Sequence, residues 1–205
     1  TPIDLYSKSF TLVTKVPAIS DILYDGKDTT AWGSKSVEVT FKVNSMSPVT
    51  VKYDNKVIEG AGNSYSFKAG ENKKYKIEAV DLFDKKAETE TAEIKIDTNP
   101  PSASKPEFYD KNGKQIKEWY NDNLTVEVLL SDSKSGIDKT SVKINNKPVT
   151  DDKLTDVENG VKLSFVADAV QDYSITFSDV AGNGGSTTVS RNEIKIDRDA
   201  TEAKD

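Results

Sequence analysis

Carboxylate and amide side chains are the residues of this sequence whose types could do chemistry, because the usual catalytic side chains are missing. The 205 residues include no His and no Cys. Imidazole acid–base catalysis, Ser-His-Asp triads, thiolate nucleophiles and metals held by Cys or His are therefore excluded. The oxygen ligands that remain are the kind that Ca²⁺ prefers.

The first candidate calcium ligands lie at two junctions in the chain. Asp97 and Asp197 each follow the same four residues, Glu-Ile-Lys-Ile. Because Ca²⁺ takes about six to eight oxygen ligands, further carboxylates would have to come from loops, such as 25–28 or 110–112. The sequence thus offers these two aspartates as partial ligand sets.

The second candidate pair is Asp179 and Asn183, which flank the turn sequence Asp-Val-Ala-Gly-Asn. Both side chains could coordinate Ca²⁺. The alternative is an Asx turn, in which the short side chain accepts hydrogen bonds from nearby backbone amides while Gly182 takes a positive φ. The residue types favour the turn. We therefore expect no cofactor, with Ca²⁺ at these four residues as the alternative.

Trp32 and Trp119 each precede an alternating apolar segment by five residues. An exposed indole is a flat surface on which a sugar ring could stack. The alternative is that each Trp closes one end of a hydrophobic core. The recurrence of the same residue at the same place in two copies favours the structural interpretation.

Carboxylates alone could also support glycoside hydrolysis, which needs a pair of Asp or Glu about 5–9.5 Å apart across a cleft. Only the abundance of acids, 34 Asp and Glu, points that way. The acidic segment 151–159 does not match EF-hand spacing, and we predict a solvated loop there. The chain is not expected to be an enzyme.

Composition narrows the class of protein further. The net charge is −6 and the pI is about 4.9, which argues against a nucleic-acid partner. No apolar run approaches the roughly 20 residues of a membrane span. The hydrophobic fraction of 35% suits two small cores better than one large core.

An internal repeat supports two cores. The segment Glu93-Ile94-Lys95-Ile96-Asp97 recurs 100 positions later as residues 193–197, and Val51-Lys52-Tyr53 resembles Val142-Lys143-Ile144. The second copy is the longer one, with extra residues around 131–138 and 151–160. Such self-similarity is typical of tandem modules.

Strict alternation of apolar and polar residues predicts β-strands in both copies. With turn signals every 8–12 residues or so, the pattern indicates an all-β fold with two tandem immunoglobulin-like β-sandwich domains. We expect the cores to contain Val37, Val39, Phe41, Tyr75, Ile77, Leu124, Val126, Val128, Tyr173, Ile175 and Phe177.

Proline marks the predicted domain boundary, because Pro cannot continue a strand ladder. The sequence Asp97-Thr98-Asn99-Pro100-Pro101 separates a first domain at 16–97 from a second at 98–205 that ends in a trailing linker. Residues 1–15 are interpreted as a leading strand, around 10–14, or as the tail of a preceding module.

Three motifs resemble those of bacterial Ig-like domains. The turn at 179–183 is similar to their D-x-A-G-N turn, the run Ser133-Lys-Ser-Gly-Ile-Asp138 to their D-S-G-S-G-I loop, and Ile96-Asp-Thr-Asn-Pro-Pro101 to their I-D-T-T-P-P linker. The first copy departs from the pattern, since Asp81-Leu-Phe-Asp-Lys85 replaces the D-x-A-G-N turn.

The resemblance implies a non-catalytic spacer of an extracellular protein at the cell surface or cell wall, of the kind found in Gram-positive adhesins and multi-modular secreted proteins. Its partners would be neighbouring Ig-like modules of the same chain, and its task to project a distal adhesive or catalytic domain. Alternatives are an adhesin module that binds host protein or glycan directly, and an accessory domain of a secreted glycoside hydrolase.

Overall fold

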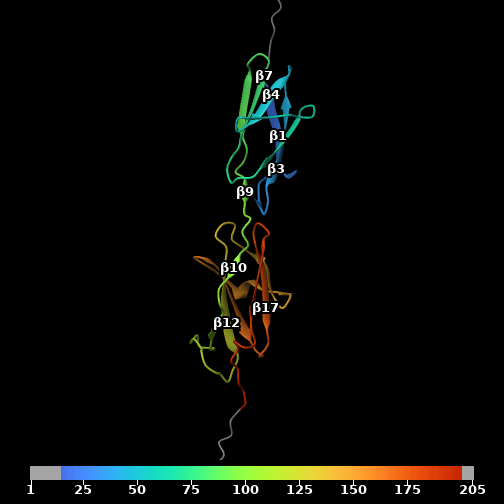
Figure 1. Ribbon diagram of the computed structural model, residues 1–205. Helices are drawn as coiled ribbons and strands as arrows, with labels where there is room; N and C mark the ends of the chain where they lie inside the picture. The colour runs from blue at the N-terminus through green and yellow to red at the C-terminus, as the bar shows by residue number, and fades with distance from the viewer. Residues whose placement is uncertain (1–14, 200–205) are drawn as a thin grey trace, which may run out of the picture. The chain divides into compact units, whose positions relative to one another are not determined.

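The computed structural model describes residues 15–199, and these form β-strands with one short 3₁₀ turn (Figure 1). The chain divides into two compact units. The first comprises the chain up to Ala31 together with Ser36–Lys95, and the second comprises Trp32–Lys35 and the chain from Ile96 onward. The predicted leading strand at 10–14 lies outside the described residues, as does the end of the predicted trailing linker.

The first unit consists of two antiparallel sheets. One has the strand order β1-β3-β6 and the other β5-β4-β7-β8. Strand β3 shows why the sequence folds this way: its residues are alternately buried and exposed, so one apolar face packs inward. The strands are β1 (Ala18–Tyr24), β3 (Val37–Asn44), β4 (Val49–Tyr53), β5 (Lys56–Ile58), β6 (Ser64–Ala69), β7 (Lys76–Asp81) and β8 (Lys86–Glu90).

The second unit repeats this strand order with additions. One sheet runs β10-β12-β16-β15, with β11 also paired to β12, and the other runs β14-β13-β17-β18. The short strands β2 (Trp32–Gly33) and β9 (Lys95–Ile96) pair with each other. The remaining elements are β10 (Ser102–Ala103), β11 (Glu107–Tyr109), β12 (Leu124–Ser131), β13 (Ile137–Ile144), β14 (Lys147–Pro148), η1 (Asp151–Lys153), β15 (Leu154–Val157), β16 (Gly160–Ala167), β17 (Tyr173–Asp179) and β18 (Gly184–Val189).

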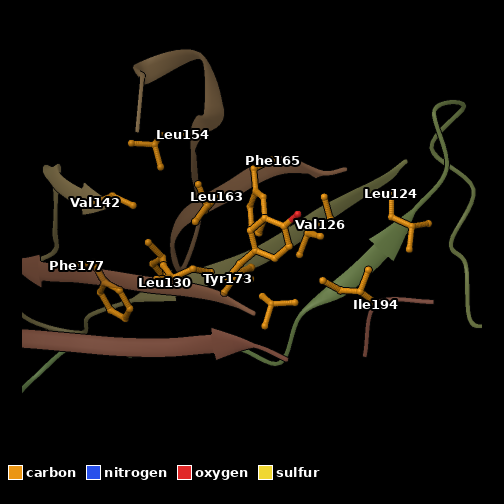
Figure 2. Packing of buried hydrophobic residues seen from close by; sticks show 14 of the residues in the cluster. Leu124, Val126, Leu130, Val142, Leu154, Leu163, Phe165, Tyr173, Phe177 and Ile194 are labelled. Atoms are coloured by element: carbon orange, nitrogen blue, oxygen red, sulfur yellow. The ribbon is translucent and has the colours of Figure 1, made fainter. Parts of the chain in front are cut away.

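Every residue that we expected in the cores is buried. In the second unit, side chains from β12, β16 and β17 converge, and the Phe165 and Tyr173 rings lie 5.3 Å apart (Figure 2). Leu124, Val126, Val128 and Ile175 are at most 1% exposed. Burying one such side chain stabilises the fold by about 1.5–3 kcal/mol, so strand alternation alone supplies a core for each unit.

The prediction of a solvated loop at 151–159 is wrong about secondary structure but not about exposure, since every residue of the segment except Leu154 is exposed. Residues 151–153 form η1, and β15 pairs with β16 from Leu154↔Leu163 to Val157↔Gly160. Leu154 is 7% exposed and belongs to the core cluster. Burial of Leu154 and pairing with β16 therefore place this acidic segment in a strand.

No helix among the described residues is long and apolar enough to cross a membrane.

Candidate metal centre

Three aspartates of the second unit converge on one place. Asp97, Asp132 and Asp179 each offer a carboxylate oxygen, and these oxygens lie within 4.8 Å of one another. Asp97 follows β9, Asp132 follows β12, and Asp179 ends β17. The carboxylates of Asp97 and Asp179 are almost fully buried, at 0% and 1% exposure.

Asp97 is fixed by its own backbone neighbours and by a loop of the second unit. Its amide donates to the Gly33 carbonyl at 2.9 Å. Its Oδ1 accepts from the Asn99 amide at 3.0 Å, and its Oδ2 accepts from the Ser135 amide at 3.0 Å. The Asp97 carbonyl accepts from Asn183 Nδ2 at 2.8 Å. The backbone and side chain of this residue are both held.

Asp179 and Asn183 form the expected Asx-type turn. Asp179 Oδ1 accepts from the Asn183 amide at 2.8 Å, the Gly182 amide donates to the Asp179 carbonyl, and Gly182 has a φ of +92°. Asn183 Nδ2 also donates to Asp179 Oδ2 at 2.7 Å. Because the same Nδ2 reaches the Asp97 carbonyl, this one side chain joins the turn to Asp97.

The loop that begins at Asp132 completes the cluster. Asp132 Oδ1 accepts from the amides of Lys134 at 3.0 Å and Gly136 at 2.8 Å, and Gly136 takes a φ of +81°. The Gly136 carbonyl accepts from the Val180 amide at 2.9 Å, which ties this loop to the Asx turn. These bonds hold the Ser135 amide in position for Asp97.

Amide dipoles compensate the accumulated negative charge. Each of the three carboxylates accepts two N–H donors. Burial raises the pKa of Asp97. Hydrogen bonds from Asn99 and Ser135 and the charge of Lys134 together lower the pKa by more than burial raises it, so the pKa is below the ordinary 3.8. Asp97 is therefore a carboxylate at neutral pH.

The cluster fits the chemistry of a hard divalent cation. Ca²⁺ is bound by carboxylate and carbonyl oxygens. The carboxylate oxygens of Asp97 and Asp179 each accept one N–H and keep a second lone pair, whereas Asp132 Oδ1 accepts two, so Oδ2 would be the ligand atom of Asp132. Among residues 15–199, none of these three aspartates has a Lys or Arg ion pair. Asn183 points its amide nitrogen at the aspartates and so contributes no oxygen ligand as placed.

The four predicted ligands do not form one group. The structure brings Asp97, Asp179 and Asn183 together, whereas Asp197 is exposed and accepts at Oδ1 from the Asp199 amide at 3.0 Å. The loops 25–28 and 110–112 do not supply carboxylates to Asp97. Asp25 Oδ1 accepts from the Glu38 amide, and Asp110 Oδ1 closes its own turn.

The two tryptophans occupy equivalent places with different surroundings. Trp32 lies in β2 and is partly buried, and Trp119 precedes Tyr120, which bridges Ile196. Trp119 is 66% exposed, so the interpretation of this residue as a core plug is wrong.

Sequence reasoning missed Asp132 and Ser135. A usable signal was present: an Asp at the start of a turn, whose carboxylate accepts the amide of the fourth residue after it, also builds the Asp179 turn. That fourth residue is Gly136 in the loop and Asn183 in the turn. Chain proximity gave no hint that this loop meets Asp97, which lies 38 residues before Ser135.

Strand order, core and turns together define two Ig-like β-sandwiches in tandem. Solved structures share this fold. A titin fragment of three Ig domains, I67–I69 with Glu-to-Ala changes, has a TM-score of 0.54 and 14% identity over 87% of this chain. Our chain spans 65% of the length of that fragment. At this identity the likeness shows the fold alone.

Two further tandem structures have lower scores. The titin domains A164–A165 have a TM-score of 0.34 and 12% identity, covering 91% of this chain and 99% of that one. The fibronectin(III)-like modules of Clostridium thermocellum CbhA have a TM-score of 0.39 and 14% identity, covering 82% and 91%. No protein family and no curated protein matches the sequence.

Proposed function

We propose that this chain is a non-catalytic spacer of an extracellular bacterial protein, at the cell surface or cell wall of a Gram-positive organism, where it holds a distal adhesive or catalytic domain away from its anchor. One observation carries the proposal: the same sandwich occurs twice in tandem. In repeat arrays, contacts run chiefly between neighbours, so each added module adds length.

The Asp97 contacts restrict the backbone at the start of the second unit's main segment. A residue with 0% exposure, whose amide, carbonyl and both carboxylate oxygens are all hydrogen-bonded, leaves the backbone little freedom where the chain enters the second unit. A loose Gly/Ser linker would behave as a random coil instead. Restricted backbone freedom at this point is what a spacer needs to transmit length.

The spacer role can be tested by surface display. The chain is placed between a cell-wall anchor and a small binding domain, and capture of ligand-coated beads is measured with one unit deleted, with both present, and with the chain doubled. We expect capture through a thick capsule to rise with the number of units. Capture independent of unit number would contradict the spacer role.

Direct adhesion is the second candidate, because Trp119 is 66% exposed. Flat aromatic surfaces of this kind stack on sugars. A glycan and host-protein binding panel separates the two functions. A hit that Trp119→Ala abolishes, with Trp32→Ala as the matched variant, would establish an adhesin in place of a spacer.

A bound Ca²⁺ would strengthen the same place. Asp97, Asp132 and Asp179 would hold it, and the ion would neutralise their clustered charge. A ligand that binds only the folded state stabilises it by RT ln(1 + [L]/Kd), about 2.7 kcal/mol at 100 times Kd. We expect millimolar Ca²⁺ to raise the second unit's melting temperature, and Asp132→Asn to remove that rise. An unchanged melting temperature would show that N–H donors alone compensate the carboxylates.

A further inference from the structure

Asp197 is the structural counterpart of Asp97. The Asp97 amide donates to the Gly33 carbonyl and the Asp197 amide to the Tyr120 carbonyl, both at 2.9 Å. Each Oδ1 accepts from the amide two residues later, at 3.0 Å. Both residues follow an Ile-Lys-Ile segment in which the two Ile side chains are buried. The hydrogen bonds that each Asp makes with its β-bridge partner and with the next residues of the chain therefore occur in both copies.

The other half exists only once among residues 15–199. Asp97 also uses its Oδ2, for the Ser135 amide, and its carbonyl, for Asn183, and these contacts bury it completely. Asp197 is exposed, and its Oδ2 has no hydrogen-bond partner within the described chain. Asp197 thus presents the free atoms that Asp97 uses to hold the loop and the turn of the second unit.

The Asp97 carboxylate and the groups that bind Asp97, the Ser135 amide and the Asn183 side chain, occur with the same unit. The second unit has the Asp132 loop and the Asn183 turn, and Asp97 lies near its start, before β10. In the first unit Lys85 stands where Asn183 does, and the shorter segment 44–48 replaces the loop. Asp97 lies five residues before β10. In the first unit, the sequence position five residues before β1 is Val13 and not an Asp. If the Asp served only its local turn, it would not be expected to occur only before a unit that has the Asp132-type loop.

We propose that Asp197 is a docking residue for a further Ig-like unit of the second unit's type. The partner is a sandwich with an Asp-Ser-x-Ser-Gly loop, whose second serine amide would donate to Asp197 Oδ2, and an Asp-x-x-Gly-Asn turn, whose Asn would donate to the Asp197 carbonyl. A unit of the first type, with Lys in place of that Asn, would lack this fit. The proposal rests on the tandem spacer function and names one residue that would hold a further module.

The experiment extends the full chain. A second copy of residues 100–199 is joined directly after Asp199, so that Asp197, Arg198 and Asp199 stay native. The appended copy alone carries ¹⁵N, introduced by segmental ligation. Amide hydrogen exchange is measured at the appended copy's Ser135 position and at its Asn183 side chain. The native chain and its Asp97→Ala variant give the reference rates.

We expect Asp197→Ala to raise exchange at the appended Ser135 position at least tenfold, as we expect Asp97→Ala to do at Ser135 of the native chain, because in each case the carboxylate that accepts this amide is removed. Asp199→Ala is the matched control, because it removes an exposed carboxylate two residues away and keeps the amide that Asp197 uses. The control should leave the rates unchanged.

Equal rates with Asp197 and with Asp197→Ala, or unchanged Ser135 exchange in Asp97→Ala, would overturn the docking role. The appended copy's core amides report whether it folds, so an unfolded copy is recognised. In that case the assay is repeated with Asp197→Asn, which tests the charge in a folded copy. Bead capture by the surface-displayed spacer is independent of this contact, so failure of the docking and failure of the spacer role are distinguishable.

Discussion

The turn at 81–85 of the first unit and the turn at 179–183 of the second are the same structure with different uses. In each, the first Asp donates its amide to the carbonyl four residues later at 3.0 Å, and its Oδ1 accepts that residue's amide at 2.8 Å. The fourth residue has positive φ in both, Asp84 at 56° and Gly182 at 92°. The turn itself is therefore structural.

The difference between the turns lies in the fifth residue. Asn183 reaches out of its turn to the Asp97 carbonyl, and Lys85 in the first unit makes no side-chain hydrogen bond or ion pair with another described residue. The two turns thus share one geometry, and having Asn instead of Lys at the fifth residue allows the second turn to hydrogen-bond another segment. The following experiments test that contrast.

Matched core substitutions give the largest expected effect. Ile77 and Ile175 are both 0% exposed and lie at equivalent places in β7 and β17. Replacing either by Ala should cost its own unit about 2–5 kcal/mol, because a cavity remains. Chemical denaturation should show one transition moving while the other stays. Movement of both transitions in each variant would mean that the two units unfold as one.

Removing the turn aspartates should cost less. Asp81 and Asp179 are both buried and each accepts two N–H donors. Since hydrogen bonds to charged groups contribute about 1.5–3 kcal/mol, Asp81→Ala and Asp179→Ala should destabilise their units by similar amounts in that range. Calorimetry of both variants checks this. A negligible loss for Asp81→Ala would show that the two turns are not equivalent.

The fifth residue should separate the units. Asn183→Ala removes the bonds to Asp97 and Asp179 and should cost about 1 kcal/mol, whereas Lys85→Ala should stay within about 0.5 kcal/mol. Denaturation midpoints of the two variants give the comparison. Equal midpoint shifts would remove the distinction between a plain turn and a receiving turn.

The smallest effect is a pH dependence. Because the pKa of Asp97 is lowered on folding, its stabilising contribution is complete above the ordinary value of 3.8 and is lost as the pH falls below 3.8 through the folded pKa. Asp97→Asn should therefore flatten the acid side of the second unit's stability profile. The first unit also has a carboxylate with a lowered pKa, the exposed Glu88, whose pKa is lowered to about 2 by hydrogen bonds from Lys76 and Lys86. Glu88→Gln is thus the control that should leave the second unit's profile unchanged.

Much of the fold could be predicted because alternation is a local signal. Strands β3, β12 and β17 alternate strictly, and their inward residues are the core. Strand β15 was missed because its pattern, one buried residue followed by three exposed ones, carries almost no periodicity. Its place is set by the ladder to β16, which a single segment cannot reveal.

The candidate site could be predicted only in part, for a related reason. Asp179 and Asn183 lie four residues apart and form a turn whose chemistry is local. Asp132 meets them only because β12 and β17 end on the same side of the second unit, and Asp97 joins through backbone groups that any sequence possesses. Contacts made by backbone amides leave little trace in residue type.

The pairing of β15 has a consequence for how the two units meet other proteins. In the first unit β6 ends its sheet, with β3 as its one ladder partner among residues 15–199, so a row of amides and carbonyls along β6 stands open to a strand from another chain. In the second unit the equivalent strand β16 is covered by β15, which ends the sheet with Asp156 exposed. Unwanted strand addition should therefore begin at the first unit.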